Sequence, residues 1–264
     1  QAMIFISGFY HISQMINFNR MTPFLKVKIL LLATLFISPI LFAETADEGV
    51  IVMSLNVYGW KTMPEHSDDY AKLIYSNNVD ILGIQEGVED WQLNFNGMNS
   101  KLPTNYQRAT TLRESLGQCW QRKFQIFINH CQGNSFIESG RFDLTDGPNA
   151  TRTGEYAVIE KLNKRYLMVN VHWDHESVAT RIANAEETSA QLNKISQYPK
   201  ILLGDFNSRC IGREALLVQS KAKMTLLKNA GIDCLFVKGL TGNARKIVAY
   251  PSDHPTIVAK LRVN

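Results

Sequence analysis

The sequence passes from an apolar strand into a polar turn at Ile201-Leu202-Leu203-Gly204-Asp205-Phe206-Asn207. The uninterrupted apolar run is typical of a strand that is buried on both faces. Asp205 and Asn207 are two positions apart, so on an extended chain their side chains point to the same side. Asp and Asn also favour turns that have no function. The stretch therefore predicts either a plain turn or the edge of a site, and the other strand ends decide between the two.

Two more apolar runs meet short polar clusters. Residues 166–170 lead into Val171-His172-Trp173-Asp174-His175, and Ser252-Asp253-His254-Pro255 leads into residues 256–259. Carboxylates, imidazoles and amides at several strand ends can hold a hard divalent cation, aim a water molecule and stabilise a pentavalent phosphorus centre. These clusters predict a hydrolase that acts on phosphate esters.

Two upstream strands fit the same pattern. Asn56 interrupts the apolar run at residues 51–57, and residues 80–86 form a buried-type strand that ends in Gln85 and Glu86. With all five motifs in this order, the chain resembles the endonuclease/exonuclease/phosphatase superfamily, which has the fold of pancreatic deoxyribonuclease. The resemblance covers about residues 50 to 264 and implies hydrolysis of a phosphate ester.

Apolar strands alternate with amphipathic helical patterns along the chain. The strands are expected near residues 50–57, 80–85, 124–129, 155–160, 166–172, 201–205, 233–237 and 256–262. Continuous apolar strands of this kind predict an α/β fold in which two β-sheets pack face to face with helices on the outside, a four-layer α/β sandwich. The segment 130–154 is rich in Gly, Asn, Asp and Thr and is expected to be a long surface loop.

Glu86 is the strongest candidate for a metal ligand. Mg²⁺ or Mn²⁺ prefers one or two carboxylates, with water and substrate phosphate completing the shell. The resemblance implies that Glu86 is the main protein ligand, assisted by Asn56 and Asp253. Taken alone, Glu86 would more readily be a solvated strand end, and the other motifs favour metal binding.

The resemblance also assigns catalytic roles to individual residues. It implies that His254 is a general base or a phosphate donor and that Asp233 orients it, although Asp233 could instead be a turn residue before a strand. Asp205 would act on the attacking water or its base, and Asn207 on the phosphoryl oxygens. His172 would donate to the scissile phosphate or to the leaving oxygen.

One family feature is missing. Many members carry a Glu that holds the first histidine, but residues 121–128 offer no acid. Either His172 relies on Asp174 instead, or the role of His172 is weaker than in those members. Asp174 could also orient local backbone or substrate. His175 is expected to be structural, at the start of the following helix.

Two arginines fall in the expected surface loop. Arg141 and Arg152 could bind substrate phosphate, or they could be solvated loop charges.

The N-terminal segment resembles a secretory signal. Lys26 and Lys28 precede an uncharged apolar run from residue 29 to Ala43, and a polar stretch follows. Residues 1–43 are therefore expected to be an N-terminal extension and signal peptide, and residues 44–264 the catalytic domain, secreted or periplasmic. An uncleaved membrane anchor is the alternative, but Pro39 and the short apolar run favour a signal, so no stable membrane insertion of the mature chain is expected.

Charge and cysteine content add two constraints. The chain has 28 basic and 24 acidic residues, and three of the basic ones lie before residue 44, leaving 25 against 24. A chain that is nearly neutral attracts a polyanionic substrate such as nucleic acid only weakly over long distances. The four cysteines allow three pairings; proximity favours Cys119–Cys131 and Cys210–Cys234, while buried free thiols remain an alternative.

The sequence therefore predicts a secreted nuclease that uses Mg²⁺ or Mn²⁺ and cleaves phosphodiester bonds of DNA. A phospholipid or phosphoinositide phosphatase is the first alternative, and a catalytically degenerate effector module is the second. The expected partner is a phosphate-ester substrate, and the sequence names no partner subunit.

Overall fold

The computed structural model describes residues 49–63, 65–87 and 111–264. The expected signal segment and its boundary at residue 44 lie outside these residues. In the part of the chain that the structure describes, no helix combines the length and the apolar character that crossing a lipid bilayer requires.

Within the described residues, twelve strands form two six-stranded sheets. The first sheet contains, in spatial order, β11 (Leu240–Val248), β12 (Pro255–Val263), β1 (Val50–Asn56), β2 (Ile81–Gln85), β4 (Ile126–Asn129) and β3 (Trp120–Lys123). The second contains β5 (Asn134–Leu144), β6 (Arg152–Lys161), β7 (Lys164–His172), β8 (Lys200–Asp205), β10 (Asp233–Lys238) and β9 (Thr225–Ala230).

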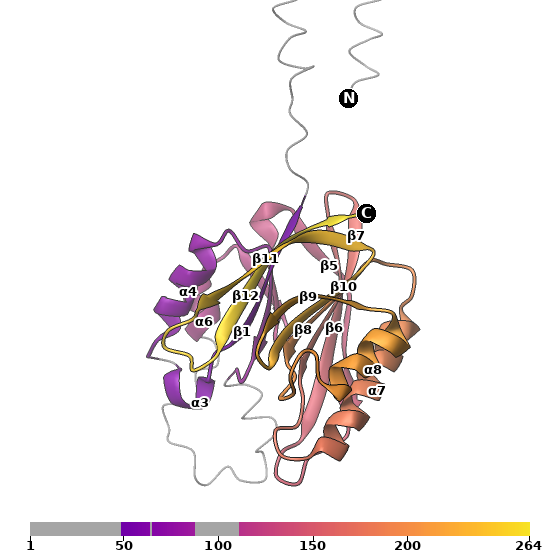
Figure 1. The fold of residues 1–264 in the computed structure, drawn as a ribbon. Helices are drawn as coiled ribbons and strands as arrows, with labels where there is room; N and C mark the ends of the chain where they lie inside the picture. Colours follow the sequence, from indigo (N-terminus) through magenta and orange to yellow (C-terminus); the bar gives the residue numbers. More distant parts are fainter. Residues whose placement is uncertain (1–48, 64, 88–110) are drawn as a thin grey trace, which may run out of the picture. The chain divides into compact units, whose positions relative to one another are not determined.

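Helices cover the outer faces of both sheets (Figure 1). The helical segments are α3 (Gly59–Thr62), α4 (Ser67–Ser76), α6 (Thr111–Leu116), η3 (His130–Gln132), α7 (Val178–Lys194) and α8 (Arg213–Ala222). Buried side chains of α4 and α6 pack on the first sheet, and those of α7 and α8 pack on the second. The predicted four-layer α/β sandwich is confirmed.

The main apolar core lies between the sheets. It includes Ile81 from the first sheet and Met168 and Leu203 from the second, all fully buried. Gly83 lets the sheets approach closely, because a Cβ atom there would lie 2.4 Å from Cδ1 of Leu203. Each Å² of apolar area buried here contributes about 25 cal/mol, so the contact between the sheets stabilises the fold together with the apolar clusters under the helices.

Four strands were not predicted, and they are the four sheet edges: β3, β5, β9 and β11. The expected loop at residues 130–154 is wrong, because β5 pairs antiparallel with β6 from Asn134 opposite Lys161 to Leu144 opposite Arg152. In β5 only Asn134 and Leu144 are buried. An edge strand that is largely exposed carries polar residues, so its sequence resembles a loop.

Strand pairing brings the polar strand ends together. In the parallel pair β1 and β2, Asn56 lies opposite Gln85, and in the parallel pair β7 and β8, His172 lies opposite Asp205. The antiparallel pair β8 and β10 sets Asp233 opposite Asp205. The residues that the sequence singled out therefore end at adjacent positions of each sheet.

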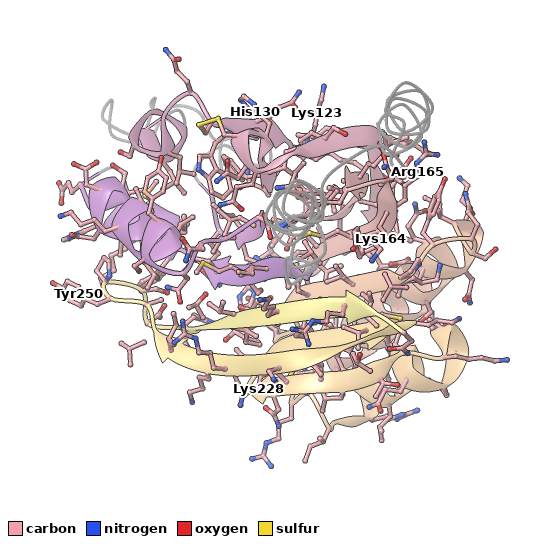
Figure 2. The ribbon with its side chains drawn as sticks, turned by 90° about the horizontal axis from the view of Figure 1, so that it is seen from above. Lys123, His130, Lys164, Arg165, Lys228 and Tyr250 are labelled. Atoms are coloured by element: carbon pink, nitrogen blue, oxygen red, sulfur yellow. A yellow bond between two sulfur atoms is a disulfide. The ribbon has the colours of Figure 1, made fainter. Side chains whose placement is uncertain are left out.

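Two disulfides are present, Cys119–Cys131 and Cys210–Cys234 (Figure 2). These are the pairs that sequence proximity favoured, and the alternative of free thiols is wrong. The second disulfide ties the segment before α8 to β10, one residue after Asp233.

Candidate active site

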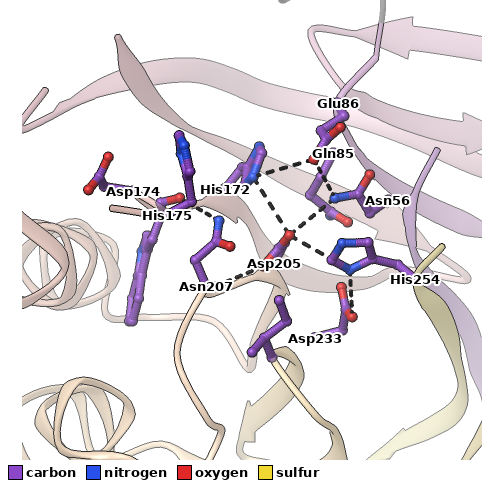
Figure 3. A network of polar contacts seen from close by, with 12 residues as sticks. Asn56, Gln85, Glu86, His172, Asp174, His175, Asp205, Asn207, Asp233 and His254 are labelled. Carbon is purple, nitrogen blue, oxygen red and sulfur yellow. Dashed lines mark hydrogen bonds and ion pairs between the residues drawn. The ribbon is translucent and has the colours of Figure 1, made fainter. Parts of the chain in front are cut away.

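A polar network lies where the ends of the two sheets meet (Figure 3). Asn56, Glu86 and His254 come from the first sheet or the residues beside it, and His172, Asp205 and Asp233 come from strands of the second sheet. Segments that lie far apart in the sequence thus form one site.

Asn56 connects two carboxylates. Its Nδ2 donates to Oε1 of Glu86 at 3.0 Å and to Oδ2 of Asp205 at 3.1 Å. Its Oδ1 accepts a hydrogen bond from the backbone N–H of Tyr58 at 2.9 Å. The amide oxygen that was expected to assist a metal ion is therefore turned toward the backbone, and Asn56 acts on the carboxylates instead.

Glu86 occupies an unusual backbone conformation. Its φ angle is 56°, in the left-handed region that non-glycine residues seldom adopt. Its carbonyl oxygen accepts a hydrogen bond from the N–H of Gly59 at 3.1 Å, and a Cβ atom on Gly59 would lie 2.1 Å from that oxygen. Such backbone conformations concentrate at functional sites, where the surrounding structure stabilises them.

Asp205 is almost fully buried at the centre of the network. Its Oδ1 accepts the N–H of Asn207 at 2.8 Å, and its Oδ2 lies 3.6 Å from Nε2 of His172 and 3.8 Å from Nδ1 of His254. Burial, reinforced by the nearby carboxylate of Asp233, raises the pKa of Asp205 to about 7. The carboxylate can therefore exchange a proton near neutral pH.

His254 is paired with Asp233, as the sequence analysis expected. Nδ1 of the ring lies 3.0 Å from Oδ2 of Asp233. Burial alone would lower the pKa of His254, but the hydrogen bond with Asp233 and the nearby charge of Asp205 together raise it to about 9. Before any cation binds, the ring is an imidazolium at neutral pH, which fits a phosphate donor better than a general base.

His172 has an arginine as its nearest partner. Its Nδ1 lies 3.2 Å from Nη1 of Arg152, and its Nε2 lies 3.9 Å from Oε1 of Glu86. Burial, followed by the positive charge of Arg152, lowers the pKa of His172 well below its ordinary value. The ring is therefore a neutral donor or acceptor at neutral pH.

Asp174 does not support His172. Its Oδ1 accepts the backbone N–H groups of Glu176 and Ser177 at 3.1 Å and 2.6 Å. These contacts match the alternative in which Asp174 orients backbone, and none of its contacts reaches His172. A role of Asp174 toward substrate stays a prediction. The cap of α7 is Ser177, whose side chain accepts from the N–H of Thr180, so His175 does not cap the helix.

The remaining predicted residues are divided between the site and its surroundings. Asn207 has a φ angle of 46°, and its Nδ2 donates to the carbonyl of Trp173 at 2.9 Å. Arg141 lies 3.8 Å from the buried Glu155 and stacks over Phe124, so it lies outside the network. Both arginines lie in strands and not in a loop, but Arg141 is exposed whereas Arg152 is partly buried.

Three side chains of the network lie close enough together to bind one cation. One ligand atom each from Glu86, Asp205 and His254 lies within 4.8 Å of the others. The two carboxylates match the oxygen preference of Mg²⁺ or Mn²⁺, whereas His254 is held by Asp233. Asp253, which was expected to assist Glu86, is exposed and is not a member of this group among the described residues.

The sequence profile of the Endonuclease/Exonuclease/phosphatase family matches residues 53–254. The chain belongs to this family. The match spans every residue of the network from Glu86 to His254. Members of the Endonuclease/Exonuclease/phosphatase family generally hydrolyse phosphoester bonds. No curated protein sequence matches the chain significantly.

Solved structures of the family share the fold. An endonuclease/exonuclease/phosphatase family protein from Bacteroides thetaiotaomicron aligns with a TM-score of 0.62 at 16% identity, over 82% of this chain and 98% of the other. A mannosyl-6-phosphatase from the same species gives 0.60 at 17% identity, over 81% and 99%. The catalytic domain of human Nocturnin, solved with a bound sulfate, gives 0.59 at 15%, over 82% and 95%.

Two supporting features of this family member were not predicted. Ser252 donates to the carbonyl of Asn56 at 2.6 Å and accepts the N–H of His254 at 3.0 Å, which fixes the loop before β12. Behind the site, Gln85 donates to Oδ1 of Asn170 at 2.6 Å between the sheets. The amide within the apolar run at residues 166–171 is the sequence signal that could have indicated this second contact.

Proposed function

We propose that this chain is a divalent-metal-dependent phosphoesterase and that it acts as a nuclease on DNA. The observation that carries the proposal is the Asn56 bridge, which holds Glu86 and Asp205 side by side with a histidine on either flank. Two carboxylates and two imidazoles around one point supply a cation site, a base and phosphate donors together.

The cation would be held by Glu86 together with water and substrate phosphate, with Asp205 next to it. When bound, Mg²⁺ or Mn²⁺ supplies Lewis-acid polarisation of the phosphoryl oxygen. Glu86 suits this role because its carboxylate is only partly buried and is oriented by Asn56.

Asp205 is the proposed acceptor of the water proton. In the metal-free protein its pKa is raised to about 7, and a general base is most effective when its pKa lies near the pH of the reaction. His254, kept protonated by Asp233, donates from its ring to an oxygen of the phosphoryl group, and the neutral His172 donates through Nε2.

The choice of a nucleic acid rests on an exposed aromatic side chain four residues before His254. Tyr250 is 72% exposed, and the ring of His66 contacts it edge-on at 6.0 Å. An exposed aromatic ring two residues before Ser252 can stack on a nucleobase, which contributes about 1–3 kcal/mol per base.

One observation favours a phospholipid as the second candidate substrate. Val248 is 83% exposed and lies two residues before Tyr250, which is 72% exposed, so this short segment carries an exposed apolar and an exposed aromatic side chain. Such a pair fits the interface of a lipid membrane as well as a nucleic acid.

Export from the cytoplasm is part of the proposal. The two disulfides support it, because they persist in oxidising compartments. N-terminal sequencing of the exported protein should find a start near Glu44, and an intact segment 21–43 on a cytosolic protein would contradict export.

A substrate panel tests the activity. Plasmid DNA, single-stranded RNA, a simple aryl phosphodiester, an aryl phosphomonoester and phosphoinositide vesicles are each incubated with Mg²⁺, with and without chelator. Cleavage of DNA above the other substrates supports the nuclease assignment. Preferential turnover of vesicles would replace it with the lipid assignment, and the absence of all turnover would overturn the enzymatic proposal.

A further inference from the structure

Arg152 lies between two histidines in the site. Its Nη1 lies 3.2 Å from Nδ1 of His172, and its Nη2 lies 2.9 Å from Nδ1 of His175. Arg152 opens β6, and its own N–H donates to Oδ1 of Asp146 at 2.9 Å, so the backbone that carries the guanidinium is fixed. The carboxylate that many members of the family place beside the first histidine has no counterpart in this position.

The chemistry of the guanidinium decides the tautomer of both rings. An arginine side chain has five N–H donors and no acceptor, and it stays charged in proteins. Each Nδ1 that faces it must therefore offer its lone pair. The proton of each neutral imidazole then resides on Nε2.

The contacts of Nε2, on the other side of each imidazole ring, favour the same tautomer. Nε2 of His172 faces Oδ2 of Asp205 at 3.6 Å, and Nε2 of His175 faces Oε1 of Glu176 at 3.4 Å. Carboxylate oxygens are acceptors, so an N–H is favoured at each Nε2. Glu176 is itself held by Nδ2 of Asn149 at 3.0 Å and 2.9 Å.

We infer that Arg152 is a positioning residue that locks His172 and His175 as Nε2–H tautomers through its two terminal nitrogens. His172 thereby presents an N–H to the point where Glu86 and Asp205 meet. Only one part of this inference rests on the proposed function, namely that the Nε2–H of His172 donates to a bound phosphate. The tautomer itself is a property of the free protein.

The site thus contains two histidines of opposite character. Nδ1 of His254 faces a carboxylate and carries a proton, while Nδ1 of His172 faces a cation and does not. A carboxylate in place of Arg152, facing Nδ1 of His172, would favour an imidazolium there as well. Arg152 instead keeps His172 as a hydrogen-bond donor that does not release its proton.

Long-range proton–nitrogen NMR of the ¹⁵N-histidine-labelled mature chain tests the inference. His172→Gln and His175→Gln assign the two signals. In the wild-type protein both rings should show the Nε2–H pattern at pH 7.5. In Arg152→Met, which removes every donor, both should shift toward a mixture of tautomers. Arg152→Lys, with one compact donor group, should restore at most one of them.

Matched controls separate this role from general damage. Arg165→Met removes an arginine from β7 that pairs with Glu160 on the surface, and it should change neither tautomer. The His254 signal should stay unchanged in Arg152→Met. On a substrate found by the panel, kcat should fall about 10–100-fold in Arg152→Met with little change in KM.

The experiments distinguish failure of this inference from failure of the proposed function. An Nδ1–H pattern for His172 in the wild-type protein, or unchanged tautomers in Arg152→Met, would overturn the inference even if the enzyme is active. Tautomers that respond as expected in a protein that cleaves no phosphoester would uphold the inference and reject the proposed function.

Discussion

Nδ1 of His254 lies 3.0 Å from Oδ2 of Asp233, and this hydrogen bond raises the pKa of the ring to about 9 against the effect of burial. Below that pH the ring is an imidazolium that the Asp233 carboxylate orients. The protonation state of His254 therefore depends on one neighbouring charge.

Asp233→Asn should lower the pKa of His254 toward or below its ordinary value, because the amide retains an acceptor but loses the charge. At pH 7.5 the ring would change from charged to largely neutral. We expect kcat/KM to fall about 10²–10⁴-fold. NMR titration of His254 measures the shift, and Asp143→Asn, at an exposed position of β5, is the control. An unchanged pKa of His254 would refute the role of Asp233.

Removal of the divalent cation should abolish activity. Chelator should stop turnover, and Mg²⁺ should restore it, because polarisation of the phosphoryl oxygen would be lost. Glu86→Gln should weaken Mn²⁺ binding, measured by calorimetry, by at least about tenfold. Glu186→Gln, on the surface of α7, should bind Mn²⁺ normally. Full activity in chelator would show that the mechanism is not metal-dependent.

His172→Ala and His254→Ala should each lower kcat about 10²–10⁴-fold without unfolding the protein. The double variant should be little worse than either single one, because groups that act as a unit are not additive. His175→Ala should retain most activity, since its ring is exposed and faces Glu176. His130→Ala, whose exposed ring contacts the carbonyl of Gln118, is the folding control. Loss of activity in His175→Ala would show that His175, and not His172, has the catalytic role.

The two disulfides should differ in their effect on activity. Replacing either pair by Ala should reduce the free energy of unfolding by about 2–4 kcal/mol. Only loss of Cys210–Cys234 should also lower kcat, because Cys234 follows Asp233 directly and Sγ of Cys210 lies 3.2 Å from the carbonyl of Asp233. The Cys119–Cys131 pair is the matched control. Equal kcat values in both variants would contradict this coupling.

The buried Lys200 should make stability rise with pH. Burial, assisted by the charge of Lys238, lowers the pKa of Lys200 from 10.5 to about 8. Between these values the unfolded chain binds more protons than the folded one, so the penalty for burying the charge disappears as the pH increases. The difference in Tm between the wild type and Lys200→Met should therefore change between pH 7.5 and 10.5 in favour of the wild type. A constant difference would show that Lys200 keeps its ordinary pKa.

The interior of the fold was predictable from the sequence, and its edges were not. Buried strands such as β8 form continuous apolar runs, whereas β5 and β11 are exposed along most of their length and resemble loops. Pairing of an edge strand depends on its neighbour's backbone more than on its own side chains.

Most residues of the site were also predictable from the sequence, but two of their contacts were not. Glu86, Asp205 and His254 stand at strand ends, so their convergence follows from strand pairing. The partner of His172 did not follow, because Arg152 reaches it from a segment that resembled a loop. The orientation of the Asn56 amide was equally inaccessible, since it depends on the N–H of Tyr58.

Because Asn56 belongs to one sheet and Asp205 to the other, the 3.1 Å hydrogen bond between them exists only while the two sheets remain in register. A loosened state could keep all its helices and strands and yet separate these two atoms. Turnover is therefore a stricter measure of native packing in this protein than its far-ultraviolet spectrum. On heating, activity should disappear before secondary structure does.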